Sequence, residues 1–263
     1  MAEPISVSPS PPPISSCGSK AKGHWEVYDI YFGASTDGGV TWSPSVRVND
    51  ETVDPAAHKP HPSLVISDGG YIYVAWQDQR NGNDDIYMTR SDDGGATWPF
   101  QNTFVTDDPQ TTLQVQRSPS IGLGSMQHIY IAWEDWRDPV HPEIYVADSD
   151  DQGLTFGVDV PVEDPAGQSY RVAPTMLAWP TTTVVTVEKT IPNTNFTYLA
   201  VETAIVDVIH VAWQECQDEN ANIYYAYAWY SYSHNALENE APPVPAYEFF
   251  FRPTVQVNGY YYD

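Results

Sequence analysis

The feature that most constrains the fold is a set of three sequence markers that recurs along the chain in a fixed order. A Pro followed by a small hydroxyl residue and an apolar residue opens a repeat, and an alternating aromatic and β-branched run ending in Ala-Trp follows. The third marker is an acidic or amide residue before Ile-Tyr. Each interval has room for about four short strands, so the repeat excludes a helical solenoid. The tyrosines of the third marker are Tyr31, Tyr87, Tyr145 and Tyr224.

Composition supports an all-β fold for the chain. Its 18 Tyr, 9 Trp, 23 Pro and 16 Gly accompany apolar residues that fall in short runs between turn residues. Aromatic and β-branched residues favour strands, whereas Pro and Gly favour the connections between them. Because one four-stranded unit per repeat is a propeller blade, the sequence predicts a β-propeller.

The chain is strongly acidic, with 35 Asp and Glu, 11 Lys and Arg, and a formal net charge of −24. This charge would repel nucleic acids and anionic membrane surfaces, so we expect neither as a partner. It suits an extracellular or cell-surface protein, a saline habitat, or carboxylate clusters that hold Ca²⁺. We expect no required cofactor, with Ca²⁺ as the one ion that the composition suggests.

Neither a membrane span nor a secretory leader is visible in the sequence. No stretch approaches the roughly 18 apolar residues that cross a bilayer, so we expect no membrane insertion. The start Met1-Ala-Glu-Pro lacks the basic and apolar segments of a signal peptide. We therefore expect the chain to be a mature or recombinant form.

Three of the Ile-Tyr strands lead into a turn with the pattern Ser-x-Asp-x-Gly-x-Thr followed by Trp or Phe. This pattern resembles the Asp-box, or BNR repeat, of sialidases and of many secreted propellers that are not sialidases. In that family the turn joins the third and fourth strands of a blade and is structural. Its Asp can accept hydrogen bonds from turn N–H groups, and its Gly permits a positive φ. The residues that carry the resemblance are Ser35, Asp37, Gly39, Trp42, Ser91, Asp93, Gly95, Trp98, Ser149, Asp151, Gly153 and Phe156.

The resemblance implies a propeller domain over residues 25–263, preceded by a Pro-rich N-terminal arm over residues 1–24. We predict four blades, because residues 26–48 and 252–263 look like complementary halves of one blade. Sharing a blade between the two ends would remove exposed strand edges. The alternatives are a fragment of the six-bladed ring of true sialidases, or an arm that pairs with a neighbouring subunit.

The two cysteines, Cys17 and Cys216, exclude a disulfide scaffold and a four-Cys zinc site. Both lie near the same face of blades that would be neighbours in a closed four-bladed ring. The sequence therefore suggests a Cys17–Cys216 disulfide that staples the ring.

The loops opposite the Asp-box face carry a recurring Trp-Gln/Glu-Asp-x-Arg pattern. In sialidases this face holds the active site. A carboxylate and an Arg at fixed spacing can also tie a loop together, and we favour that structural interpretation because the pattern repeats from blade to blade. The candidate binding-face residues are Gln77, Asp78, Arg80, Glu134, Asp135, Arg137, Gln214 and Glu215.

Arginines near the starts of first strands are the candidate carboxylate-binding residues: Arg117, Arg171 and Arg252. In sialidases three such arginines grip the substrate carboxylate, and only Arg117 has the family's spacing to its Pro. The sialidase Tyr nucleophile with its Glu cannot be singled out in this sequence. We therefore expect these arginines to pair with loop carboxylates such as Asp78, Asp135 or Glu215.

Together these patterns favour a binding or structural module over an enzyme. The expected partners are a glycan, an extracellular protein, or a second copy reached through the N-terminal arm. The alternative is an exo-acting glycoside hydrolase of sialidase type.

Overall fold

A computed structural model describes residues 5–9, 29–50, 59–107, 114–162, 170–190, 196–217, 220–231 and 255–256. The strands in these residues form four antiparallel sheets, so the fold is all-β as expected. The first sheet contains β1 (Ile5–Pro9), β2 (Ile30–Ala34) and β3 (Val46–Arg47), and the second contains β4 (Ser63–Ile66), β5 (Ile72–Asp78), β6 (Asp85–Ser91) and β7 (Thr103–Phe104). The third contains β8 (Gln116–Leu123), β9 (Ile129–Asp135), β10 (Glu143–Ser149) and β11 (Val160–Pro161). The fourth contains β12 (Tyr170–Thr190), β13 (Thr197–Gln217), β14 (Asn220–Ser231) and β15 (Val255–Gln256).

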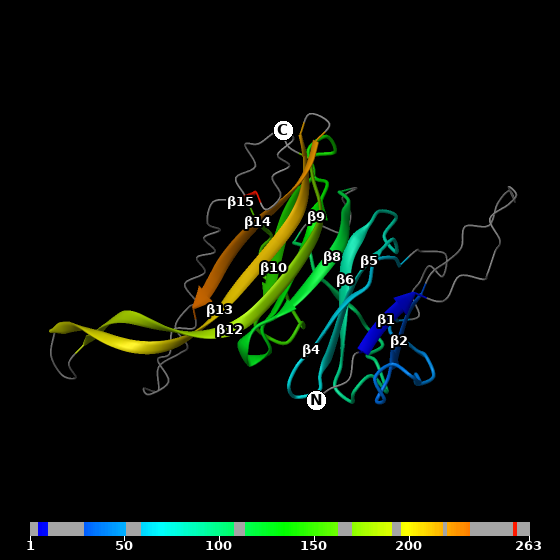
Figure 1. The fold of residues 1–263 in the computed structure, drawn as a ribbon, viewed down its shortest axis with the longest axis horizontal. Coiled ribbons are helices and arrows are strands. Elements are labelled where there is room, and N and C mark those ends of the chain that lie inside the picture. The colour runs from blue at the N-terminus through cyan, green and yellow to red at the C-terminus, as the bar shows by residue number, and fades with distance from the viewer. Residues whose placement is uncertain are drawn as a thin grey trace, which may run out of the picture.

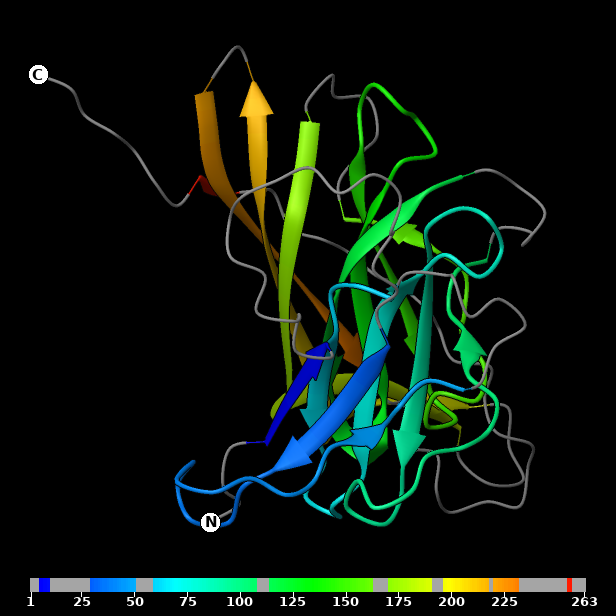
Figure 2. The same cartoon turned by 90° about the vertical axis from the view of Figure 1, so that its right-hand side faces the viewer.

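The sheets follow one another across the molecule in chain order (Figure 1), with an apolar core between each consecutive pair. Figure 2 shows the first sheet, in blue, in front of the second. Among the described residues, no core cluster joins the fourth sheet to the first. The described part of the chain is therefore an open series of sheets.

A Trp–Tyr pair repeats in the sheet cores and fixes their register. Trp76 lies opposite Tyr87, Trp133 opposite Tyr145, and Trp213 opposite Tyr224. All three tryptophans are buried. The Ala-Trp and Ile-Tyr markers thus belong to the second and third strands of each four-stranded sheet.

The position of the C-terminal strand shows that the predicted closure of the ring is wrong. Residues 252–263 were expected to share a sheet with residues 26–48, but β15 pairs with β14. The Tyr of each Ile-Tyr marker faces the last strand of its own sheet, and Tyr224 faces Gln256 as Tyr31 faces Arg47. The C-terminal strand takes this fourth position because the edge of β14 offers the same register. The first sheet instead receives β1 from the N-terminal arm, beside β2.

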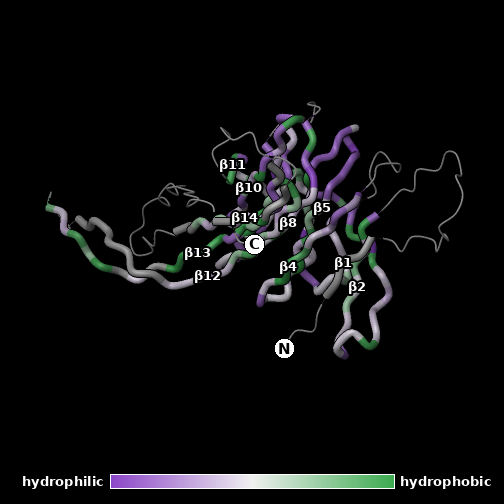
Figure 3. The backbone as a smooth tube through the Cα atoms, turned by 45° about the horizontal axis from the view of Figure 1, so that its top comes forward, coloured by the Kyte–Doolittle hydropathy of each residue, from purple (hydrophilic) through white to green (hydrophobic). Residues whose placement is uncertain are grey.

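The long strands β12 and β13 extend beyond the other sheets as a two-stranded ribbon (Figure 1). β14 pairs with β13 only over Val206–Gln217, so the outer half of the ribbon lies past the third strand. Figure 3 colours this ribbon mostly green and white, whereas loops at the top of the body are largely purple. No helix in the described residues is long and apolar enough to cross a membrane.

Candidate functional site

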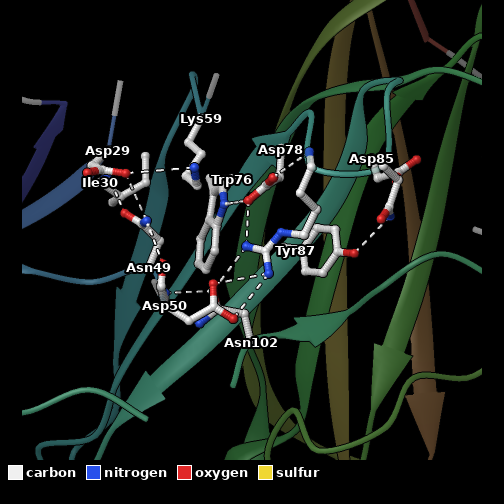
Figure 4. Close-up of polar contacts among 12 residues, drawn as sticks. Asp29, Ile30, Asn49, Asp50, Lys59, Trp76, Asp78, Asp85, Tyr87 and Asn102 are labelled. Atoms are coloured by element: carbon white, nitrogen blue, oxygen red, sulfur yellow. Dashed lines mark hydrogen bonds and ion pairs between the residues drawn. The ribbon is translucent and has the colours of Figure 1, made fainter. Parts of the chain in front are cut away.

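The loop that follows β5 is built around Asp78. Its buried carboxylate accepts hydrogen bonds from Trp76 Nε1 at 2.8 Å, from the Arg80 backbone N–H at 2.9 Å and from Arg80 Nη2 at 2.6 Å (Figure 4). The Arg80 guanidinium also reaches Asp50 of the neighbouring sheet at 3.1 Å. Asp78 therefore ties the loop to its own strand, and Arg80 links two sheets.

The loop that follows β9 repeats this arrangement around Asp135. The carboxylate accepts hydrogen bonds from Trp133 Nε1 at 3.2 Å and from the Arg137 backbone N–H and Nε at 2.9 and 2.8 Å. Arg137 lies over the Tyr145 ring at 3.9 Å, as Arg80 lies over Tyr87 at 4.0 Å. Each of these guanidinium groups thus contacts both a carboxylate and an aromatic face.

The fourth sheet has the same contact of a carboxylate with a Trp and an Arg, but the Arg comes from a different part of the chain. Glu215 replaces the Asp, accepting a hydrogen bond from Trp213 Nε1 at 3.4 Å and one from Arg171 Nε at 3.2 Å. Arg171 comes from the first strand of the sheet and not from the loop. This contact confirms the expectation that Arg171 pairs with a loop carboxylate.

Cations near the first strands contact carboxylates near the third strands of the preceding sheets. Lys59 Nζ lies 3.7 Å from Asp29 Oδ1, Arg117 Nε lies 2.7 Å from Asp84 Oδ2, and Arg171 Nη1 lies 4.0 Å from Glu143 Oε1. Each cation thus contacts a different carboxylate. Arg252 lies outside the described residues.

The residue before each first-strand Pro has a left-handed backbone that the sequence analysis missed. His61, Ser118 and Ala173 have φ of 56°, 53° and 54°. This conformation is uncommon for residues other than Gly, and in β8 and β12 it coincides with a shift of strand register. The Ala173 N–H donates to Glu134 Oε1 at 2.8 Å, so the carboxylate of one sheet supports the bulge of the next.

One aromatic group at this end of the sheets breaks the repeat symmetry. Trp136 occupies the position that Gln79 has in the preceding repeat, and its Nε1 donates to Glu134 at 3.2 Å. Tyr170 meets it edge-on at 5.3 Å, and the Arg117 guanidinium lies 5.4 Å from its ring. Tyr170 and Arg117 are partly exposed, and Trp136 is half-buried. Trp136, Tyr170 and Arg117 form what we call the aromatic platform.

Burial shifts the pKa of several groups on this face. Burial raises the pKa of Tyr87 and of Tyr145, although the nearby guanidinium groups oppose the shift. Burial also raises the pKa of Glu143, against the opposing effect of Arg171. In all three groups burial favours the neutral form.

The Ser-x-Asp-x-Gly-x-Thr turns lie at the opposite ends of the sheets, because Ser91 pairs with Ile72 whereas Asp85 pairs with Asp78. Asp93 accepts hydrogen bonds from Thr97 Oγ1 at 2.6 Å, from the Thr97 N–H at 2.9 Å and from Ser91 Oγ at 2.8 Å. The Thr97 hydroxyl is the largest influence that lowers the pKa of Asp93, to about 2. Asp37 and Asp151 accept the same bonds in their turns.

The glycines of two turns are required by the neighbouring sheet. Gly95 has φ +88°, and a Cβ there would lie 2.1 Å from the Phe32 ring. Gly153 has φ +83°, and its Cβ would lie 2.6 Å from the Met88 methyl. These turns thus pack on the core of the preceding sheet, which is a structural role.

The described residues do not test the predicted disulfide or the predicted Ca²⁺ site directly. Cys17 and the side chain of Cys216 lie outside the described residues. Within the described ranges, no group of three or more His, Cys, Asp or Glu side chains is placed to hold a metal ion. The Cys17–Cys216 disulfide and the Ca²⁺ site remain predictions.

Comparison with known proteins shows a fold resembling propeller glycoside hydrolases. The intramolecular trans-sialidase of Ruminococcus gnavus matches with a TM-score of 0.52 and 13% identity, over 89% of this chain and 41% of that one. An α-L-arabinanase of Penicillium chrysogenum matches with a TM-score of 0.48 and 17% identity, over 87% and 58% of the two chains. A protein of unknown function from Dyadobacter fermentans has a TM-score of 0.43 and 13% identity, over 80% and 64%. This chain thus spans less than two thirds of each. No protein-family model and no curated protein matches the sequence.

Proposed function

We propose that this protein is a secreted propeller-type module that binds neutral glycans at the aromatic platform and does not hydrolyse them. The observation that carries the proposal is Trp136, the aromatic residue that breaks the repeat symmetry at the loop face. A residue that serves every blade is repeated, whereas a ligand site needs a feature present in one place. Pyranose rings present C–H groups that pack on aromatic faces, and nearby charged groups can bind the hydroxyls.

The charges around the platform favour a neutral sugar over an acidic one. Arg117 is paired with Asp84 at 2.7 Å, and Arg171 contacts both Glu143 and Glu215. An anionic ligand would have to compete with these carboxylates and with a net charge of −24. The same pairing supports a binding role over sialidase chemistry, in which several guanidinium groups must be available to one substrate carboxylate.

The test is a glycan array of neutral and sialylated sugars, followed by titration calorimetry on any ligand found. Trp136→Ala should weaken binding at least about tenfold, which corresponds to about 1.4 kcal/mol. Trp42→Ala is the matched control, because Trp42 is a 48% exposed Trp at the opposite ends of the sheets. Equal losses in both variants, or binding restricted to sialosides, would contradict the proposal. Turnover of a fluorogenic glycoside would replace it with the glycosidase alternative.

A further inference from the structure

Glu134 differs from the residues at the same place in the second and fourth sheets. The second strands of these sheets end in Trp-Gln-Asp at residues 76–78 and in Trp-Gln-Glu at residues 213–215, whereas the third sheet has Trp-Glu-Asp at residues 133–135. The third sheet is also the one that carries Trp136, and Trp136 Nε1 donates to Glu134 Oε2 at 3.2 Å. Two departures from the repeat thus lie in one loop and contact each other. Because a residue that serves every blade is repeated, this pair of exceptions indicates a role specific to the third sheet.

The Glu134 side chain is buried, and both of its oxygens accept hydrogen bonds. Its exposed fraction is 7%. Oε1 accepts the Ala173 N–H at 2.8 Å, whereas Oε2 accepts the Trp136 indole N–H at 3.2 Å. A Gln has one acceptor oxygen and would turn its NH₂ group toward one of these two donors. The two contacts therefore explain why an acid, and not an amide, stands at this position.

The hydrogen bond to Trp136 fixes the orientation of the indole ring. The Trp136 backbone N–H donates to the Val115 carbonyl at 2.8 Å, which holds the main chain of the loop. The side chain can still adopt several rotamers on this main chain. The hydrogen bond from Nε1 to Glu134 selects one of them.

The hydrogen bond to Ala173 fixes the start of β12, which carries the second ring of the platform. Ala173 has φ of 54°, and the strand register shifts at this point. A left-handed backbone at a residue other than Gly persists only where its surroundings hold it. Tyr170 lies three residues before Ala173, and its ring meets Trp136 at 5.3 Å and 83°. Glu134 is therefore linked to one ring directly and to the other through the backbone of β12.

We propose that Glu134 is the positioning residue of the aromatic platform and that its two hydrogen bonds set the arrangement of the Trp136 and Tyr170 rings. The proposal rests on the glycan-binding function proposed above, because these rings are the groups that a sugar would contact. Glu134 itself lies beneath them and has both oxygens engaged. A ring that is already held loses less rotational freedom on binding than a ring that turns freely. Removing Glu134 should therefore weaken glycan binding although it removes no group that contacts the sugar.

Hydrogen exchange followed by NMR on the isotope-labelled full chain tests the positioning role without a ligand. The reporters are the Trp136 indole N–H, assigned by its absence in Trp136→Phe, and the Ala173 amide N–H. In Glu134→Ala both should exchange at least about tenfold faster than in the wild type, because each has lost its acceptor. In Glu134→Gln at least one of them should do so, because one amide oxygen replaces two carboxylate oxygens.

Asn102→Ala is the matched control, because it also removes the acceptor of two donors between neighbouring sheets. The Asn102 oxygen accepts the Asp50 backbone N–H at 3.0 Å and Arg80 Nη2 at 3.2 Å. This variant should leave the exchange of both reporters unchanged. On the array of neutral sugars, Glu134→Ala should lose at least about tenfold in apparent affinity, as Trp136→Ala does, whereas Asn102→Ala should bind as the wild type does.

Each result decides the proposal. Unchanged exchange of both reporters in the Glu134 variants would overturn it, as would an equal increase in Asn102→Ala, which indicates general loosening of the sheets. If neutral sugars bind Glu134→Ala as well as the wild type but do not bind Trp136→Ala, the platform binds glycans and Glu134 does not position it. If no sugar binds the wild type, the glycan-binding function is contradicted, and the exchange rates still decide whether Glu134 holds the two rings. If Glu134→Ala does not fold, Glu134→Gln supplies the same test.

Discussion

The pairing of Asp107 with Asp159 should make the contact between the second and third sheets sensitive to pH. Their backbone N–H groups and carboxylates form reciprocal hydrogen bonds of 3.1 Å, and Arg137 Nη2 lies 3.2 Å from Asp159 Oδ2. Burial, followed by the hydrogen bond with Asp107, raises the pKa of Asp159 to about 8. A protonated Asp159 can donate to the Asp107 carboxylate, whereas an ionised one repels it.

The preceding pair of sheets supplies a natural control for this effect. There Asn102 takes the place of Asp159, accepting the Asp50 N–H at 3.0 Å and Arg80 Nη2 at 3.2 Å. An amide makes the same bonds without titrating. Asp159→Asn should therefore preserve the geometry and remove the pH dependence.

The sign and size of the effect follow from the two pKa values. Because the folded-state pKa of Asp159, about 8, exceeds the unfolded value of 3.8, the contribution is complete below about pH 3.8 and is lost as pH rises through 8. The slope limit is about 1.4 kcal/mol per pH unit. We expect the wild type to lose on the order of 1–4 kcal/mol relative to Asp159→Asn between about pH 5 and pH 8.

Urea denaturation of the two proteins at several pH values within that range measures this difference. Asn102→Asp provides the converse, because it places a carboxylate opposite Asp50 and should create a new pH dependence. Stability curves for the wild type and Asp159→Asn that run parallel from pH 5 to 8 would refute the reasoning.

Two further predictions concern the turns and the loops. Asp93→Ala should lower the melting temperature. Because the pKa of Asp93 is depressed to about 2, its stabilising contribution is present above about pH 3.8 and is lost as the pH falls through 2. A melting series from pH 2 to 7 in which the wild type and the variant do not converge at low pH would contradict this. Asp78→Asn should cost about 3–5 kcal/mol, since it leaves the Arg80 guanidinium without its closest carboxylate. Asp135→Asn should cost less, because the Arg137 side chain is 34% exposed and that of Arg80 is 13%; equal losses in urea denaturation would contradict the burial argument.

Local patterns were the predictable part of this fold. The Trp-x-Asp-x-Arg pattern spans five residues, so its spacing alone predicted the contacts of Asp78 with Arg80 and of Asp135 with Arg137. The Ser-x-Asp turns are equally local, and their hydrogen bonds follow from the types of residue present. Alternating aromatic and β-branched runs likewise predicted the second strands, because each buries both faces between neighbouring sheets.

The C-terminal strand was misassigned although a signal was present. Val46-Arg-Val-Asn49 forms and follows β3, and Val255-Gln-Val-Asn258 has the same pattern in β15 and the two residues after it. Val48, at the third position of this pattern, is buried in the core, and its N–H donates to the Ile30 carbonyl at 2.8 Å. The Pro at position 253 suggested a first strand instead. The Pro marker therefore suggested the wrong place in the sheet for this strand. The Val-x-Val-Asn pattern that it shares with residues 46–49 indicates the right one.

The arginines near the first strands were expected to pair with loop carboxylates, but spacing in the sequence could not assign the partner of each one. Arg117 is 33 residues from Asp84, and Arg171 is 44 residues from Glu215, so no spacing rule connects them. Turning this face into an acid-binding site would require releasing both guanidinium groups. For a buried pair such as Arg171 with Glu215, separation typically costs about 3–5 kcal/mol. The glycan site that we propose does not require this cost, because the ring of Trp136 can contact a neutral ligand without breaking either ion pair.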